Sequence, residues 1–264
     1  MGVIASTVVG GWVILTRLSP EYSLIRCQTR PVLAHVFGPS ELWPDQDLIG
    51  FSSEFDADLV VAAYYSGVFP MPLHSTRFDY EMGWWSPVRR GVLELNDLRC
   101  TDSLRKSSKH YLTSVDVAFE QVLAACADPK RPDGWIDPDI VAVYTELHRR
   151  GIAHSVESWD ASGRLVGGLY GVSIGALFAG ESMFHDQELG RDASKVALVR
   201  LVEQLRARPD GEALLDVQWI TPHLASLGAS EIERDGYLML LSEALNRSDT
   251  IWPNPARSYR RIHA

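Results

Sequence analysis

The sequence predicts a mixed α/β protein of the α+β kind, and three observations lead to this prediction. First, apolar residues recur at helical spacing in several segments of the 264-residue chain. Second, three strand-like runs follow one another with only short turns between them, which is typical of an antiparallel meander. Third, helices precede this meander, and a helix, a strand and a further helix follow it. This order indicates one large domain built on a mixed sheet.

The first part of the chain is expected to form a separate, small N-terminal domain. A helix is predicted over residues 58–66 because apolar residues recur there at helical spacing and Gly67 follows its end. A strand is predicted over residues 91–95, and the boundary between domains is placed near residues 86–90. The chain is thereby divided into a disordered extension, a small N-terminal domain, an acetyltransferase-like domain and a tail: 1–40, 41–88, 89–250 and 251–264.

The large domain shows helices and strands in clear alternation. Apolar stripes predict two helices; the second is opened by Asp137 as N-cap with Pro138 at the first helical position, and is closed by Gly151. Strands are predicted over residues 153–159, 165–172 and 176–184. They are followed by a helix that begins near residue 192, a strand over residues 213–220, a short helical turn that ends near residue 227, and a helix over residues 237–246. Such an order is that of an acetyltransferase-like domain, and it does not by itself supply a function.

Composition excludes several classes of protein. Three cysteines without close spacing argue against a disulfide framework and against a zinc site. The apolar segment 2–15 is shorter than the roughly 20 residues that span a bilayer, and Arg17 follows it instead of preceding it as in a signal peptide. The net charge of −9 is not that of a general nucleic-acid binder, so an RNA partner would need a local basic patch. We expect a cytoplasmic protein without a membrane role.

Polar residues inside apolar strands mark the first candidate site. Asp216 and Gln218 lie within the apolar run 214–220, two residues apart, so a regular strand would project both from one face. A carboxylate can orient the amide of a Gln, whose carbonyl oxygen can then accept a hydrogen bond from an amine. The alternative is a polar edge strand with both side chains in solvent. Buried carboxylates are costly unless they are paired or used, which keeps the first interpretation open.

Glu181 is the second candidate, because it stands between apolar residues of the preceding strand. It is a candidate partner for a cationic group of a substrate, since a charge-assisted bond to a buried carboxylate is strong. The alternative is a carboxylate neutralised by Lys195, by Arg164 or by the end of a neighbouring helix. Spacing alone does not choose between the two.

Two aromatic residues also allow two interpretations, one structural and one functional. Trp135 precedes a predicted helix and Tyr144 lies on it. Either residue fits a plain core position, and either ring could stack on an unpaired base, an interaction that contributes about 1–3 kcal/mol. His154 and His223 lack a nearby nucleophile and are expected to be structural.

Several ordered motifs give the chain a family resemblance over about residues 48–240. The chain resembles the bacterial leucyl/phenylalanyl-tRNA–protein transferases in the segments Ala63-Tyr-Tyr-Ser-Gly-Val-Phe-Pro70, Trp84-Trp-Ser-Pro87, Gly134-Trp-Ile136, Ala153-His-Ser155, Gly180-Glu-Ser-Met-Phe184, Ala193-Ser-Lys195, Asp216-Val-Gln218 and His223-Leu-Ala-Ser-Leu-Gly228. A set of motifs in this order is far more specific than any one of them.

The resemblance implies an enzyme that moves Leu or Phe, or Met, from charged tRNA to the N-terminal Arg or Lys of a protein. The product would then be degraded by the N-end rule. It implies a small N-terminal domain before an acetyltransferase-like domain, a monomer, and no metal or organic cofactor. By motif matching, Asp216 and Gln218 take the place of the catalytic pair and Glu181 faces the acceptor.

Further substrate contacts follow from the same resemblance. Aromatic positions near the aminoacyl-adenosine fall on Tyr64, Trp135 and Tyr144. A pocket for an apolar side chain that is unbranched at Cβ falls on Leu169, Phe178, Met183 and Leu215.

The chain departs from the family pattern mainly in its first domain. Ser52-Ser-Glu-Phe55 replaces a Gly-Gly-Asp-Leu run, Met71 replaces a Trp, and Val88-Arg89-Arg90 replaces Asp-Pro-Arg. These departures favour a relative that binds aminoacyl-tRNA without turnover. Two further alternatives also stay open: a Fem-like transferase that uses the same donor, and an acyl-CoA-dependent N-acyltransferase. The acyl-CoA enzyme would need a glycine-rich pyrophosphate loop before a helix, for which residues 190–195 are a poor match.

Overall fold

The computed structural model describes residues 4–9, 12–17, 36–73, 82–131 and 134–262. It confirms the mixed α/β class, with two sheets and helices packed on them. The chain divides into two compact units, Met1–Arg89 with Glu233–Leu238, and Arg90–Ile232 with Met239–Ala264. We call them the smaller and the larger unit.

The smaller unit contains a five-stranded sheet in the order β1-β2-β3-β5-β4. Its strands are β1 (Ile4–Val9), β2 (Trp12–Arg17), β3 (Leu48–Ser52), β4 (Phe69–Pro72) and β5 (Met82–Trp85). Strands β1 and β2 lie where we expected a disordered extension, and their runs of β-branched residues favour strand structure. The other domain limits stay predictions.

One helix of the smaller unit confirms a prediction. Helix α1 (Ala57–Tyr65) begins at Asp56, whose side chain accepts a hydrogen bond from the N–H of Leu59 at 2.8 Å. It packs against β4. A short 3-10 helix covers Ser40–Leu42. Trp84 on β5 is fully buried and donates its indole N–H to the hydroxyl of Ser52 at 2.8 Å, which satisfies both polar groups.

The larger unit is built on a seven-stranded sheet in the order β12-β6-β11-β10-β9-β8-β7. Its strands are β6 (Arg89–Val92), β7 (Leu112–Val115), β8 (Ala153–Trp159), β9 (Leu165–Ile174), β10 (Leu177–His185), β11 (Leu214–Gln218) and β12 (Ser230–Glu233). The predicted meander is confirmed, because β8 and β9, and β9 and β10, pair antiparallel. Strand β11 then pairs parallel with β10 and antiparallel with β6.

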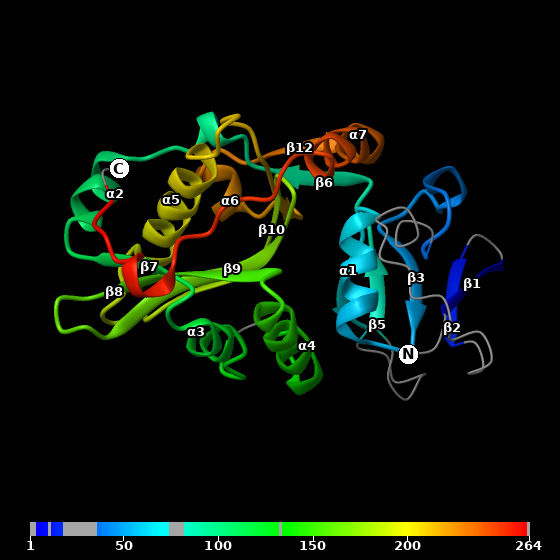
Figure 1. The fold of residues 1–264 in the computed structure, drawn as a ribbon, viewed down its shortest axis with the longest axis horizontal. Coiled ribbons are helices and arrows are strands. Elements are labelled where there is room, and N and C mark those ends of the chain that lie inside the picture. The colour runs from blue at the N-terminus through cyan, green and yellow to red at the C-terminus, as the bar shows by residue number, and fades with distance from the viewer. Residues whose placement is uncertain (1–3, 10–11, 18–35, 74–81, 132–133, 263–264) are drawn as a thin grey trace. The chain divides into compact units, whose positions relative to one another are not determined.

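Helices cover both faces of the meander (Figure 1). Helices α3 (Phe119–Cys126) and α4 (Pro138–Arg149) lie on one face, and α5 (Ala193–Arg206) lies on the other. Asp137 caps α4 as predicted, with its carboxylate 2.9 Å from the N–H of Ile140. The other helices are α2 (Asp102–Ser108), α6 (Pro222–Ser226), α7 (Arg234–Leu245) and the 3-10 segments Leu95–Asp97 and Pro255–Arg257.

The place where β10 and β11 separate is the feature that positions the candidate site. Their parallel pairing runs from Leu177 and Leu214 to Ala179 and Asp216. Each strand continues past this pairing with a polar residue two positions further on, at 181 and at 218. Within the described ranges, no helix is long and apolar enough to cross a membrane.

Candidate active site

Asp216 is the most deeply buried charged member of the predicted site. It lies on β11, opposite Arg90 of β6, and both side chains are about 1 % exposed or less. The guanidinium of Arg90 binds both carboxylate oxygens, with Nε 2.8 Å from Oδ1 and Nη2 2.5 Å from Oδ2. This bidentate geometry pairs two buried charges that would each be costly alone. The solvent-exposed polar edge considered for Asp216 is therefore wrong.

The backbone at Gln218 is strained and is held by Asp216. The register between β11 and β6 shifts between these two residues, and Gln218 has a φ of 57°. A non-glycine residue in this left-handed region costs about 1–3 kcal/mol. The N–H of Gln218 donates to Oδ1 of Asp216 at 2.9 Å, which stabilises the turn of the chain. The alternation from which we placed both side chains on one face of the strand is interrupted here.

The side-chain amide of Gln218 makes a different contact from the one predicted. Its Nε2 donates to Oε1 of Glu181 at 3.2 Å, while Asp216 contacts the backbone of Gln218. A carboxylate can only accept hydrogen bonds, so the amide must turn its N–H₂ group toward Glu181. This orientation directs the carbonyl oxygen of the amide elsewhere, where it can accept a hydrogen bond.

Glu181 connects β10 to helix α4. Its Oε2 accepts a hydrogen bond at 2.9 Å from the hydroxyl of Tyr144, a fully buried residue. The side chain of Glu181 is half-buried. The cations considered as its neutralising partners form ion pairs with other residues: Arg164 with Asp186, and Lys195 with Asp192. The carboxylate of Glu181 is thus held in position by hydrogen bonds and remains partly accessible to solvent.

Behind Glu181 lies a buried polar cluster that we did not predict. The ring of Tyr170 meets that of Tyr144 edge-on at 5.5 Å, and its hydroxyl has no hydrogen-bond partner in the part of the chain that the structure describes. Burial, and then the nearby charge of Glu181, raise the pKa of Tyr170 well above its usual value. Burial raises the pKa of the neighbouring Cys126 thiol to about 11, so this cysteine is a thiol at neutral pH.

Arg131 extends this cluster toward strand β10. Its Nη2 donates to the backbone oxygen of Met183 at 2.8 Å. Its other terminal nitrogen, Nη1, is buried and has no partner among the described residues. In the sequence, Arg131 was one of several basic residues with no feature to single it out.

The apolar residues predicted to line a pocket do come together. Leu169, Phe178 and Leu215 are buried members of one cluster on the sheet, which α5 completes, and Met183 packs against it half-buried. Trp135 is half-buried just before α4, which fits both of the roles considered for it. Tyr64 is buried on α1 of the smaller unit, so its contact with the substrate stays a prediction.

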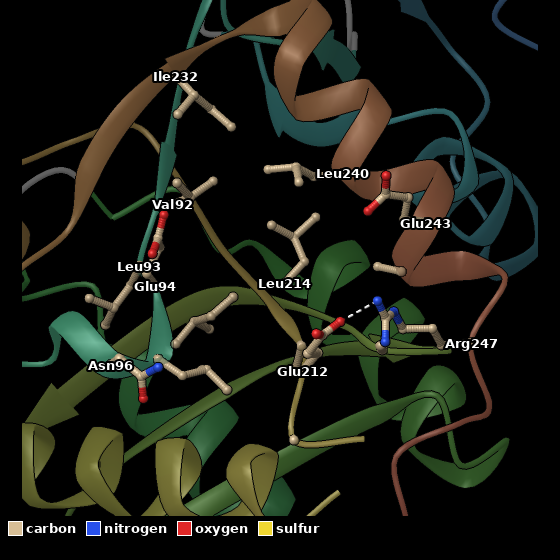
Figure 2. Close-up of a pocket in the computed structure, with 16 residues that line it drawn as sticks. Val92, Leu93, Glu94, Asn96, Glu212, Leu214, Ile232, Leu240, Glu243 and Arg247 are labelled. Carbon is tan, nitrogen blue, oxygen red and sulfur yellow. Dashed lines mark ion pairs between the residues drawn. The ribbon is translucent and has the colours of Figure 1, made fainter. Parts of the chain in front are cut away.

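A separate hollow of about 300 Å³ lies at the other end of β11 (Figure 2). Apolar side chains such as Leu214 and Leu240 form its wall, and Glu212, Glu243 and Arg247 stand at its edge. Arg247 pairs with Glu212 there. Of the predicted site residues, only Leu215 lines this hollow. No group of three potential metal ligands occurs among the residues that the structure describes.

Comparisons with known proteins agree with the resemblance drawn from the motifs. A family model described as leucyl/phenylalanyl-tRNA protein transferase matches residues 92–242, and the model of its N-terminal domain matches residues 53–88. The chain is similar to the leucyl/phenylalanyl-tRNA–protein transferase of Rhizorhabdus wittichii, with 50% identity over 194 residues, 72% of this chain and 75% of the relative. That of Nitrosomonas eutropha is 43% identical over 210 residues, 76% of this chain and 84% of the relative.

Similarity to solved structures is weaker. A tandem GNAT protein from the clavulanic acid biosynthesis pathway is 14% identical, with a TM-score of 0.36 and coverage of 88% of this chain and 79% of that one. L-PGS from Bacillus licheniformis is 9% identical, with a TM-score of 0.35 and coverage of 84% and 70%. Both likenesses are too distant to bear on the chemistry of this site.

Proposed function

The chain belongs to the leucyl/phenylalanyl-tRNA protein transferase family, and from this premise we propose how its site transfers an aminoacyl group. The donor is Leu-tRNA, Phe-tRNA or Met-tRNA, and the acceptor is the α-amino group of a protein that begins with Arg or Lys. The transferred residue marks the acceptor for N-end-rule degradation in the cytoplasm, and the enzyme acts as a monomer. The observation that supports this proposal best is the hydrogen-bonded chain from Tyr144 through Glu181 to Gln218.

The reaction needs positioning more than strong acid–base catalysis. The α-amino group has a pKa of about 7.7–8.0, so a useful fraction is neutral near neutral pH. Its nitrogen attacks the carbonyl carbon of the activated ester, the new C–N bond forms, and the ester C–O bond breaks. The nitrogen loses a proton and the terminal ribose oxygen of the tRNA gains one. Aligning amine and carbonyl can lower the barrier by several kcal/mol.

Each member of the hydrogen-bonded chain has a role in this alignment. The amide carbonyl of Gln218 accepts a hydrogen bond from the attacking amine, because its N–H₂ group is held by Glu181. The same half-buried carboxylate attracts the guanidinium or ammonium group of the acceptor's first residue. Leu169, Phe178, Met183 and Leu215 form the apolar surface for the donor side chain. Tyr64 and Trp135 contact the aminoacyl-adenosine.

A transfer assay tests the reaction and its acceptor rule. Radiolabelled Leu-, Phe- and Met-tRNA are each offered to peptides that begin with Arg, Lys or Ala. We expect label on the Arg and Lys peptides only. Parallel reactions offer cell-wall precursors as acceptors, or acyl-CoA as the donor; transfer in one of these reactions instead would support the Fem-like or the acyl-CoA-dependent enzyme. Binding of charged tRNA by a folded protein without any transfer would support a non-catalytic relative.

The role of Glu181 is tested by Glu181→Gln. Loss of the negative charge removes the attraction to a cationic acceptor, and we expect KM for the Arg peptide to rise about tenfold or more, since a bond to a charged group contributes about 1.5–3 kcal/mol. The matched control is Glu188→Gln, the same chemical change at an exposed position after β10. Equal KM values for the two variants would show that Glu181 does not bind the acceptor.

A further inference from the structure

Three hydrogen bonds of Asp216 point to an anchoring role. Oδ1 accepts from Nε of Arg90 and from the backbone N–H of Gln218, and Oδ2 accepts from Nη2 of Arg90. The carboxylate is completely buried. A proton taken up by this carboxylate would weaken these hydrogen bonds, because it removes the negative charge that strengthens them. Here, loss of the negative charge would place a neutral group beside the buried guanidinium of Arg90.

The same contacts set the conformation of Gln218. Its left-handed backbone places the amide within reach of Glu181, which lies two residues past the part of β10 that pairs with β11. The fixed Oδ1 of Asp216 is the acceptor that holds the N–H of this strained residue. Arg90 in turn fixes the carboxylate in two directions through its planar fork.

We propose that Arg90 is a positioning residue of the transferase, which acts through Asp216 to hold the backbone of Gln218 for catalysis. In this arrangement Asp216 accepts no proton during the reaction; it is a fixed hydrogen-bond acceptor whose charge Arg90 neutralises. Arg89, its neighbour in sequence, does not share this role, because it is exposed and pairs with Glu233. The inference rests on the proposed function, since it assigns Arg90 to the same site.

The decisive experiment compares Asp216→Asn with the double variant Arg90→Gln/Asp216→Asn. In the single variant the guanidinium of Arg90 faces a neutral amide in place of the carboxylate, and we expect kcat to fall about 100-fold or more. In the double variant the Oδ1 of the introduced amide can still accept from Gln218, and its N–H₂ group can donate to the side chain at position 90. We expect the second change to restore kcat at least tenfold relative to the single variant. If the charge of Asp216 were itself needed for the chemistry, both variants would be equally inactive.

A second variant keeps the inference testable if the double variant does not fold. Arg90→Lys retains the charge but lacks the fork, so we expect kcat to fall about tenfold while KM for tRNA and for the Arg peptide stays within twofold. Arg89→Lys is the matched control, expected within twofold for all three constants. A folded Arg90→Lys enzyme with the kcat of the wild type would overturn the inference. Turnover by the wild-type enzyme is measured first, so failure of the proposed function is seen separately from failure of these comparisons.

Discussion

At the scale of single residues, two tyrosines whose rings are in contact are predicted to differ in their effect on activity. Tyr144 donates to Glu181, whereas the hydroxyl of Tyr170 has no hydrogen-bond partner in the described part of the chain. Tyr144→Phe removes a bond to a carboxylate, so we expect kcat/KM for Arg peptides to fall about tenfold or more. Tyr170→Phe should keep kcat/KM within twofold. Steady-state kinetics on both variants decide this, and an equal loss would mean that packing, not the bond to Glu181, is what matters.

The sequence could indicate the polar residues of the site but not their connections. Glu181, Asp216 and Gln218 stood out because polar residues interrupted apolar strands. Arg90 could not be distinguished from Arg89 by sequence, because the two residues are adjacent and of the same type. In strand β6, Arg89 is exposed and Arg90 is buried. The contact between Asp216 and the backbone of Gln218 depends on a register shift and on a positive φ at Gln218. Neither feature could be predicted from the residue types in this segment.

At the scale of elements, two glycines that face each other across β9 and β10 are predicted to differ. A Cβ at Gly171 would lie 2.3 Å from the backbone oxygen of Ala179 and 2.6 Å from the ring of Phe178. At its register partner, Gly180, the nearest atom would be 3.6 Å away. We expect Gly171→Ala to lower the free energy of unfolding by about 1–3 kcal/mol, and Gly180→Ala to change it by less than about 0.5 kcal/mol. Urea denaturation of both variants measures this, and similar losses would contradict it.

Elements with a strong pattern were predicted and irregular ones were not. The meander and helices α1, α4 and α5 followed from alternation, spacing and caps. Strand β6 was expected over residues 91–95 but covers Arg89–Val92, because the apolar run continues past the strand into a 3-10 turn. Strand β7 (Leu112–Val115) was not predicted, because it has only four residues and two of them are Thr and Ser, so it shows no clear apolar pattern.

At the scale of the whole molecule, a buried acid should couple stability to pH. Glu157 on β8 is fully buried and accepts hydrogen bonds from Ser114 and Ser155. Burial is the largest influence on its pKa and raises it above the usual 4.5, although these bonds act in the opposite direction. The folded state therefore holds the proton more tightly than the unfolded chain does. This contribution to stability is complete below pH 4.5 and is lost as the pH rises through the raised pKa.

Glu157→Gln removes this dependence, because an amide does not titrate. We expect the free energy of unfolding of the wild type, relative to this variant, to fall as the pH rises from about 4.5 through the raised pKa of Glu157, by roughly 1.4 kcal/mol for each unit of pKa shift. Urea denaturation at several pH values gives the two curves. Glu120→Gln, on the exposed face of α3, is the control. Parallel curves for wild type and Glu157→Gln would contradict the prediction.

The overall class and the order of elements in the larger unit could be predicted, because a sheet with helices on both faces imposes periodic patterns over most of its length. The strand order could not, since nothing in the sequence near residues 89–92 indicates that this strand pairs with β11, more than 120 positions later. The strands at residues 4–9 and 12–17 were not predicted, although β-branched residues are frequent in both, because an apolar segment too short to span a membrane indicated only an extension.

The pairing of β6 with β11 has a consequence for the order of events during folding. The ion pair between Arg90 and Asp216 joins residues 126 positions apart, whereas the meander forms from neighbouring strands. Closing a long loop costs more chain entropy than closing a hairpin, so contacts between distant residues form later. We expect refolding protein to regain its circular dichroism before its transferase activity. The return of turnover would then report the last strand entering the sheet.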